Sequence, residues 1–203
     1  MNLETTKCNL EKKGFTVKLF QTSDEAAVYL DKSIDSTSVG IGGSITVRDM
    51  NLFDILSTHN QVWWHNNADQ VKQYGAGYIR SHASDTEVYI SSANGVSENG
   101  QIVNIDNTGN RIASLCYGHQ KVYIIVGKNK IEETLEKTIW RVRNIAAPKN
   151  AQRLGLKTPC ALKGDKCYDC ASPARICRGF LIIERPLKGQ ETEIILVNED
   201  LGY

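Results

Sequence analysis

Short apolar runs alternate with helical patterns along most of this chain, and that alternation restricts the fold more than any other feature. Residues 15–20 alternate apolar and polar side chains as a half-buried strand does, and the hydroxyls and acids of residues 22–25 are typical of a helix start. The same strand-then-helix order recurs with short links. Parallel strands joined by crossover helices produce this order. We therefore predict an α/β fold with a mostly parallel sheet flanked by helices.

The individual elements follow from the same patterns. We expect strands at residues 15–20, 38–41, 62–64, 88–92, 101–106, 121–127, 180–184 and 193–197. Paired Asn-Gly steps before residue 101 indicate a hairpin or tight reversal. We expect helices at residues 23–34, 44–56, 68–82, 109–117 and 131–145, the third weakened by two glycines and the last ended or kinked by Pro148. The last two strands are candidates for an antiparallel pair.

Composition and charge narrow the class of protein. The 203 residues are 41% hydrophobic and 23% charged, enough for one folded domain with a core. A net charge of +1 gives no reason to expect nucleic-acid binding. No apolar run approaches the roughly 18 residues of a membrane span, and residues 1–7 lack the order of a signal peptide, so we expect a cytoplasmic protein. We predict one α/β domain over residues 1–203, with a cysteine-rich segment, residues 157–179, inserted before the last two strands.

A glycine turn follows the predicted strand at residues 38–41. Gly42, Gly43, Ser44 and Thr46 stand between that strand and the next helix. Glycine lets an anion approach backbone N–H groups, and the two hydroxyls add donors. Neither the Walker motif nor the dinucleotide-binding fingerprint is present. We predict that the turn binds a phosphate or carboxylate, and the alternative is a tight turn that binds nothing.

A second polar stretch surrounds the predicted strand at residues 101–106. Asn104 and Asp106 alternate along that strand, so both side chains project from one face. Asn110 and Arg111 follow, and arginine can pair with an anion through two hydrogen bonds. We predict that these four residues line a ligand pocket, with Asp106 as the candidate acid or base.

Four of the six cysteines stand close together near the C-terminus: Cys160, Cys167, Cys170 and Cys177. In a reducing compartment, clustered thiols are metal ligands or redox groups more often than disulfides. The central Cys-x2-Cys lets two thiolates reach one metal, and the two outer cysteines complete a set of four sulfur ligands. We predict a 4Fe–4S cluster. Structural zinc and free or disulfide-paired thiols are the alternatives.

Several other residues receive a structural interpretation. Lys128 and Lys130 follow a predicted buried strand. We expect a solvated turn there, and the alternative is that they face a ligand at the carboxyl end of that strand. Trp63 and Trp64 point to opposite sides of a strand, so one should lie in the core and the other at the surface.

Several segments together carry a family resemblance. They are Val39-Gly-Ile-Gly-Gly-Ser-Ile-Thr, Gly100-Gln-Ile-Val-Asn-Ile-Asp-Asn-Thr-Gly-Asn-Arg-Ile-Ala, Ala146-Ala-Pro-Lys-Asn-Ala-Gln-Arg-Leu, Thr158-Pro-Cys, Cys167-Tyr-Asp-Cys-Ala-Ser-Pro-Ala-Arg-Ile-Cys and Glu199-Asp-Leu-Gly. In this order they resemble the lactate-utilisation (LUD) domain family. The cysteine segment is similar to that of a short four-cysteine subgroup.

The resemblance implies both a fold and a role. The fold would be like that of sugar-phosphate isomerases and coenzyme A transferases, where the glycine turn contacts an anion and the stretch containing Asn104, Asp106 and Asn110 lines the same crevice. The role would be the oxidation of lactate to pyruvate within a multi-subunit iron–sulfur complex. The sequence departs from the isomerases at Ala93-Asn94, which stands where they carry an acid.

Three functions stay open at this point. The first is a redox-linked protein that binds a small carboxylate or phosphate-containing ligand and passes electrons through a four-cysteine iron–sulfur site. The second is an isomerase- or transferase-like enzyme of the same fold with a structural zinc site. The third is a non-catalytic partner subunit of a lactate-oxidising complex. The sequence leaves open whether the chain forms a homo-oligomer.

Overall fold

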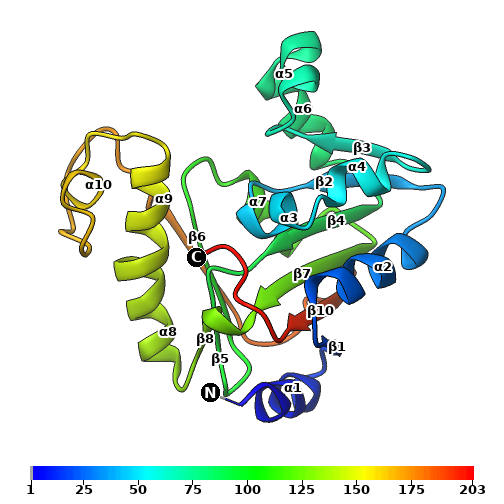
Figure 1. The fold of residues 1–203 in the computed structure, drawn as a ribbon, viewed down its shortest axis with the longest axis horizontal. Coiled ribbons are helices and arrows are strands. Elements are labelled where there is room, and N and C mark those ends of the chain that lie inside the picture. Colours follow the sequence, from blue (N-terminus) through cyan, green and yellow to red (C-terminus); the bar gives the residue numbers. More distant parts are fainter. Residues whose placement is uncertain (1) are drawn as a thin grey trace.

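A six-stranded parallel sheet forms the centre of the protein, in a computed structural model that describes residues 2–203 (Figure 1). Its strand order is β1 (Thr16–Phe20), β10 (Glu191–Val197), β7 (Lys121–Gly127), β4 (Val88–Ser92), β2 (Ser38–Ile41) and β3 (Gln61–Trp64). Every neighbouring pair runs parallel. The predicted α/β fold with a mostly parallel sheet is therefore confirmed.

A smaller mixed sheet, which the sequence patterns did not predict, lies beside the main one. Its order is β8 (Ile131–Glu132), β5 (Gly95–Ser97), β6 (Ile102–Asp106) and β9 (Gly179–Ile183). Strands β5 and β6 form an antiparallel hairpin, as the Asn-Gly steps indicated. The suggested antiparallel pairing of the last two strands is wrong, because β9 pairs with β6 while β10 lies between β1 and β7. Nearly every residue of β10 is buried, as in a central parallel strand covered on both faces.

Helices cover both faces of the main sheet. One hydrophobic core lies between one face of the sheet and three helices, α2 (Ser23–Ser33), α3 (Ile45–Asp49) and α4 (Leu52–Leu56). Residues of α1 (Leu3–Lys12), α7 (Asn110–Cys116) and the small sheet share the other. Within β7, Tyr123 and Ile125 belong to the first core, whereas Val122 and Ile124 belong to the second. The two-residue period of the strand thus divides its apolar side chains between the layers.

Two predicted helices are each broken in two by one residue. The helix expected at residues 44–56 is α3 and α4, because Asn51 between them has a left-handed φ of 52°. The helix expected at residues 68–82 is α5 (Ala68–Tyr74) and α6 (Ala76–Ala83), because Gly75 has a φ of 82°. A left-handed residue cannot continue an α-helix, so the chain turns at both positions.

The helix expected at residues 131–145 is also different. Its first two residues form β8, and α8 (Leu135–Arg141) begins after the cap residue Thr134. A π-helical turn (Val142–Ala146) then leads into α9 (Ala147–Arg153), so Pro148 does not end the helix. Proline has no N–H for an intrahelical hydrogen bond, and the wider π-helical turn directly before Pro148 lets the helix continue past it. The short helix α10 (Pro159–Lys163) follows, and residues 164–178 contain no helix or strand. Across residues 2–203, no helix is long and apolar enough to cross a membrane.

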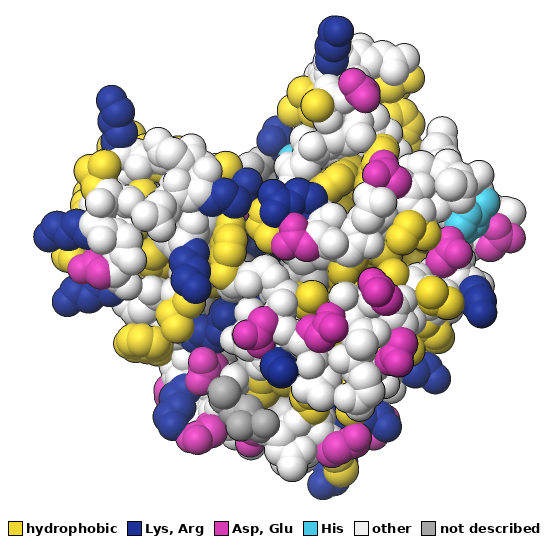
Figure 2. Space-filling view, in the orientation of Figure 1, with side chains coloured by type: hydrophobic (Ala, Val, Ile, Leu, Met, Phe, Trp, Pro, Cys, Tyr) yellow, Lys and Arg dark blue, Asp and Glu magenta, His cyan; other side chains and the backbone are white. Residues whose placement is uncertain are grey.

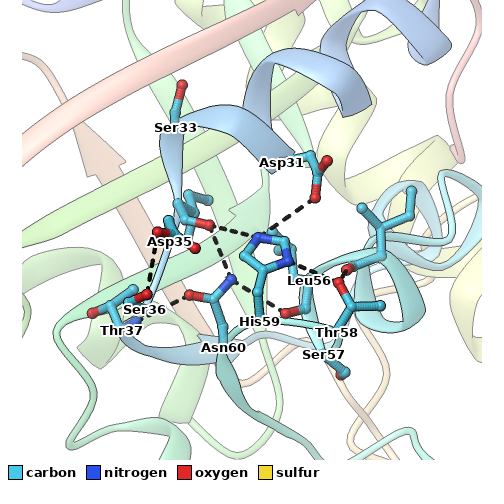
Figure 3. Close-up of polar contacts among 12 residues, drawn as sticks. Asp31, Ser33, Asp35, Ser36, Thr37, Leu56, Ser57, Thr58, His59 and Asn60 are labelled. Carbon is cyan, nitrogen blue, oxygen red and sulfur yellow. Dashed lines mark hydrogen bonds and ion pairs between the residues drawn. The ribbon is translucent and has the colours of Figure 1, made fainter.

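The loop before β3 secures the end of α2 and the start of β2 (Figure 3). The side-chain amide of Asn60 donates to the carbonyl oxygen of Ile34 over 2.9 Å, and the His59 ring lies 3.0 Å from the same oxygen. The Asn60 side-chain oxygen accepts from the Thr37 backbone N–H over 3.1 Å. These bonds satisfy polar groups that the helix end leaves free, and they fix where β2 enters the sheet.

The close approach of α6 to the sheet depends on a glycine in β2. A Cβ atom on Gly40 would lie 2.1 Å from the carbonyl oxygen of Ala83, at the end of α6. Only glycine permits this contact. The contact matters for function because α6 carries Arg80 toward the carboxyl edge of the main sheet.

Candidate functional site

A cavity of about 250 Å³ opens at the carboxyl edge of the main sheet. The segments that follow β2, β3, β4 and β7 meet there, together with α6, α9 and the C-terminal residues. Figure 2 shows the surface hollowed between the α5–α6 side and the α8–α10 side, with Lys and Arg side chains gathered at the hollow. In open α/β sheets this edge is where ligands bind.

The glycine turn contributes one wall. Gly43, Ser44 and Thr46 line the cavity. The Ser44 hydroxyl accepts from the Val47 backbone N–H over 3.2 Å and lies 2.9 Å from the Ser92 hydroxyl. These two contacts join the turn after β2 to the end of β4.

Gly42 supports the turn but is not among the residues that line the cavity. A Cβ atom there would lie 2.8 Å from the Tyr89 hydroxyl and 3.0 Å from the Ser91 hydroxyl. The Gly42 carbonyl accepts from the indole N–H of Trp64 over 3.2 Å. Trp64 is therefore the core tryptophan of the predicted pair, while Trp63 packs against aromatic rings of α5 and α6.

Asp106 lines the cavity, and its side chain also caps the N-terminus of α7. Its carboxylate accepts from three backbone N–H groups, those of Asn107 at 3.0 Å, Arg111 at 3.1 Å and Ile112 at 3.4 Å. A carboxylate at a helix N-terminus is stabilised by these donors. Much of the negative charge of Asp106 is thus already compensated by backbone dipoles.

Arg111 is a basic side chain held in a fixed position. It is only 8% exposed, and its guanidinium donates to Ile105 O over 2.6 Å, to Asn94 Oδ1 over 2.9 Å and to Gly43 O over 3.5 Å. Its Nε is buried without a partner among the described residues. All its named acceptors are neutral, so its positive charge is not cancelled by them.

Lys130 contradicts the expectation of a solvated turn, because it is only 2% exposed and lines the cavity. Its Nζ donates to the hydroxyl oxygen of Thr46 over 2.7 Å. Burial lowers the pKa of the Lys130 ammonium to about 7, and the positive charges of Arg141 and Arg111 add to this effect. The buried turn forms because the C-terminal chain crosses it, with Asn129 Oδ1 accepting from Leu201 N over 3.1 Å.

His65 and Arg80 complete the polar wall. Burial, and to a smaller extent the neighbouring Arg80 charge, lower the pKa of His65 to about 4, so the ring is neutral near pH 7. His65 Nδ1 and Arg80 Nε are both buried without a hydrogen-bond partner in the described chain. Both residues line the cavity, and a buried polar atom without a partner calls for an explanation such as a bound water or ligand.

The predicted pocket residues are only partly brought together. Asn104 is fully buried behind the wall, where its Oδ1 accepts from the Asn94 backbone N–H over 3.2 Å. Asn110 is the first residue of α7 and, like Asn104 and Gly42, is not among the lining residues. Asp106 and Arg111 do line the cavity.

Sequence reasoning did not select His65, Arg80 or Arg153 for the wall, and it favoured a solvated turn over a ligand-facing position for Lys130. A usable signal existed for His65, which directly follows β3, and for Lys130, which follows β7, because parallel strands end at one edge of the sheet. Arg80 on α6 and Arg153 on α9 reach the cavity through tertiary packing, which no local pattern reports.

The four clustered cysteines lie on α10 and the irregular segment after it. All four are free, partly buried thiols. Cys167 and Cys177 line one small cavity of about 100 Å³, together with arginines 143, 175 and 178, whereas Cys160 and Cys170 do not. Over residues 2–203, no three His, Cys, Asp or Glu side chains lie close enough together to hold a metal ion. As arranged, the thiols do not fit a shared metal centre.

The cysteine segment adjoins the larger cavity. Ile176, the neighbour of Cys177, lines the larger cavity, and Ile105 lines both cavities. The two cavities therefore share part of their wall.

Together these features define an α/β protein with a basic, polar cavity at the carboxyl edge of a parallel sheet. The sequence matches the LUD domain over residues 3–197, so the chain belongs to the LUD-domain family. The crystal structure of a DUF162-family protein from Deinococcus radiodurans is similar in fold, with a TM-score of 0.53 and 9% identity over 96% of this chain and 95% of that chain. No protein with a curated description matches the sequence. The predicted family resemblance is confirmed.

Proposed function

We propose that the protein binds a small carboxylate or phosphate-containing anion in the cavity at the carboxyl edge of the main sheet. One observation carries this proposal. Of the described residues that line the cavity, four are lysine or arginine and one is a carboxylate, and that carboxylate already accepts from the start of α7. Arg80 and Lys130 form no ion pair within residues 2–203.

An anion would accept hydrogen bonds from groups that lack a partner among the described residues. The buried Nε atoms of Arg80 and Arg111 and Nδ1 of His65 lack partners in the described structure. Hydrogen bonds to charged groups contribute about 1.5–3 kcal/mol each, and leaving such groups unpaired costs a similar amount. A ligand with two or three acceptor oxygens fits this set of donors.

Arg80→Gln is the sharpest test of anion binding, because the Arg80 side chain forms no hydrogen bond in the described structure whose loss would disturb the fold. Titration calorimetry with inorganic phosphate and with acetate should show binding to the unaltered protein. Loss of one charged hydrogen bond should weaken affinity about ten- to a hundredfold in the variant.

Arg48→Gln is the matched control. Arg48 also stands near the glycine turn, on α3, but it is exposed and pairs with Asp49 over 2.7 Å outside the cavity. Its loss should leave affinity unchanged. Equal effects of the two substitutions, or no binding of either anion by the unaltered protein, would refute the proposal.

We propose, second, that the cysteine segment gathers its four thiols around one centre, a 4Fe–4S cluster or, alternatively, zinc. This requires residues 164–178 to rearrange, and these residues contain no helix or strand that would have to unfold. The shared cavity of Cys167 and Cys177 supports the proposal, as does the absence of disulfides among the described cysteines. With iron, the protein has the redox-linked role that its family resemblance implies in lactate oxidation. With zinc, it fits an isomerase- or transferase-like enzyme.

Anaerobic purification with iron, sulfide and zinc analysis distinguishes these cases. We expect iron and sulfide together with visible absorbance, and loss of both in Cys170→Ser. Cys8→Ser is the control, since Cys8 is exposed on α1 and outside the segment. Stoichiometric zinc without iron would favour the enzyme alternative. Metal-free protein would exclude both centres and leave the anion site or a partner-subunit role.

A further inference from the structure

Lys130 stands apart from the other basic residues of the cavity. It is almost fully buried, it has no carboxylate partner in the described chain, and its single hydrogen bond is to the neutral hydroxyl of Thr46 at 2.7 Å. A lysine that serves only as packing normally keeps its ammonium in water or pairs it with an acid. Here the Nζ atom is instead held in the wall of a cavity that is open to ligands.

We propose that Lys130 Nζ forms an imine with the carbonyl group of a small acid, an aldehyde or ketone whose carboxylate or phosphate occupies the anion site. This inference rests on the proposed anion binding and specifies the ligand class. Arg111 and Arg80 bind the acid group, and the fixed Lys130 amine faces the same cavity.

The surroundings of Lys130 favour the neutral, nucleophilic amine. Arg141 and Arg111 both oppose a further positive charge there, while Asp49 is the one facing carboxylate that favours it and acts more weakly. Arg141 is itself fixed by hydrogen bonds to Asn129 O at 3.0 Å and Asn94 O at 2.6 Å. Burial and these charges hold the pKa of Lys130 at about 7, so about half of the amine is neutral at that pH.

The chemical step is simple. The Nζ lone pair forms a bond to the carbonyl carbon, and the carbonyl π electrons move to oxygen. The oxygen leaves as water with the two hydrogens of the amine, and a C=N double bond remains. No oxidant or reductant is consumed. Added borohydride then delivers hydride to the imine carbon, and a proton from water completes a stable secondary amine.

Borohydride trapping with peptide mapping tests the proposal. The unaltered protein is incubated with glyoxylate or, separately, with glycolaldehyde phosphate, then reduced and digested. We expect the peptide containing Lys130 to gain the mass of the aldehyde less one oxygen atom, in preference to exposed lysines. The trapped fraction should rise about tenfold between pH 6 and pH 8, following the neutral amine. The aldehyde that reacts better identifies the acid group.

Two variants and a binding measurement complete the test. Lys130→Arg keeps the charge and should abolish trapping, whereas Lys128→Arg, an exposed neighbour in the same turn, should not change it. Labelling spread evenly over surface lysines, or none at Lys130, would overturn the inference even if Lys130→Arg fails to fold. If calorimetry shows phosphate binding without labelling, only the imine is refuted. If it shows no anion binding at all, the proposed function fails as well.

Discussion

If the cavity binds an anion as proposed, the buried Lys130 beside Thr46 should make that binding sensitive to pH. Thr46 is fully buried, so the hydroxyl that accepts from Lys130 Nζ does so away from water. A bound anion would favour the charged ammonium and therefore raise its pKa above about 7. Anion binding then takes up a proton, and by linkage the affinity must fall as pH rises through this range.

Sulfate is the right probe for this effect, because its own charge does not change between pH 6 and pH 9. We predict that sulfate affinity, measured by calorimetry, falls about three- to tenfold over that interval. His65 does not contribute, since its pKa of about 4 keeps it neutral throughout. Lys130→Arg should give a flat profile, because arginine stays charged. A slope that persists in this variant would assign the effect to another group.

At the level of elements, the strands of the main sheet were predictable, whereas three of the predicted helices have different boundaries in the structure. The strand predicted at residues 121–127 is β7, since a continuous apolar run of that length fits a strand covered on both faces. The helix breaks depend on left-handed backbone at Asn51 and Gly75. Asparagine and glycine permit this conformation but do not require it. The periodic apolar pattern continues through such residues and therefore does not reveal the helix break.

Non-local pairing explains the other differences in the fold. Ile131 fits the apolar stripe of the predicted helix, yet it lies in β8, paired with Val96 of β5. Likewise β9 pairs with β6 rather than with the strand that follows it. Such partners are far apart in the chain, and the local sequence does not encode which of several strand edges will be available.

Within the candidate site too, residues that belong to a short motif were predictable, and residues buried by distant segments were not. Gly43, Ser44 and Arg111 were found because a short motif carries their chemistry. Lys130 was interpreted as a solvated residue, although it follows a buried strand. Its burial depends on Leu201 and the C-terminal chain crossing the turn, which is a contact between distant segments.

At the scale of the whole molecule, the larger cavity and the cysteine segment share wall residues. Ile105 lines both cavities, and Ile176 connects the larger cavity directly to Cys177. A ligand that packs against Ile176 stabilises the neighbouring chain and makes its local opening rarer. By reciprocity, a change that orders the cysteine segment should alter anion affinity by the same factor.

Alkylation of the thiols in metal-free protein measures this coupling. We predict that saturating sulfate slows the reaction of Cys177 with iodoacetamide about threefold or more, as expected when local opening is suppressed by a bound ligand. Cys8 is the internal control, because it is exposed on α1 and lines neither of the two cavities. Arg80→Gln should remove the protection at the same sulfate concentration. Equal slowing at Cys8 and Cys177 would mean that sulfate acts on the alkylation reaction itself. Unchanged rates at both cysteines would show that ligand binding in the larger cavity is not coupled to local opening of the cysteine segment.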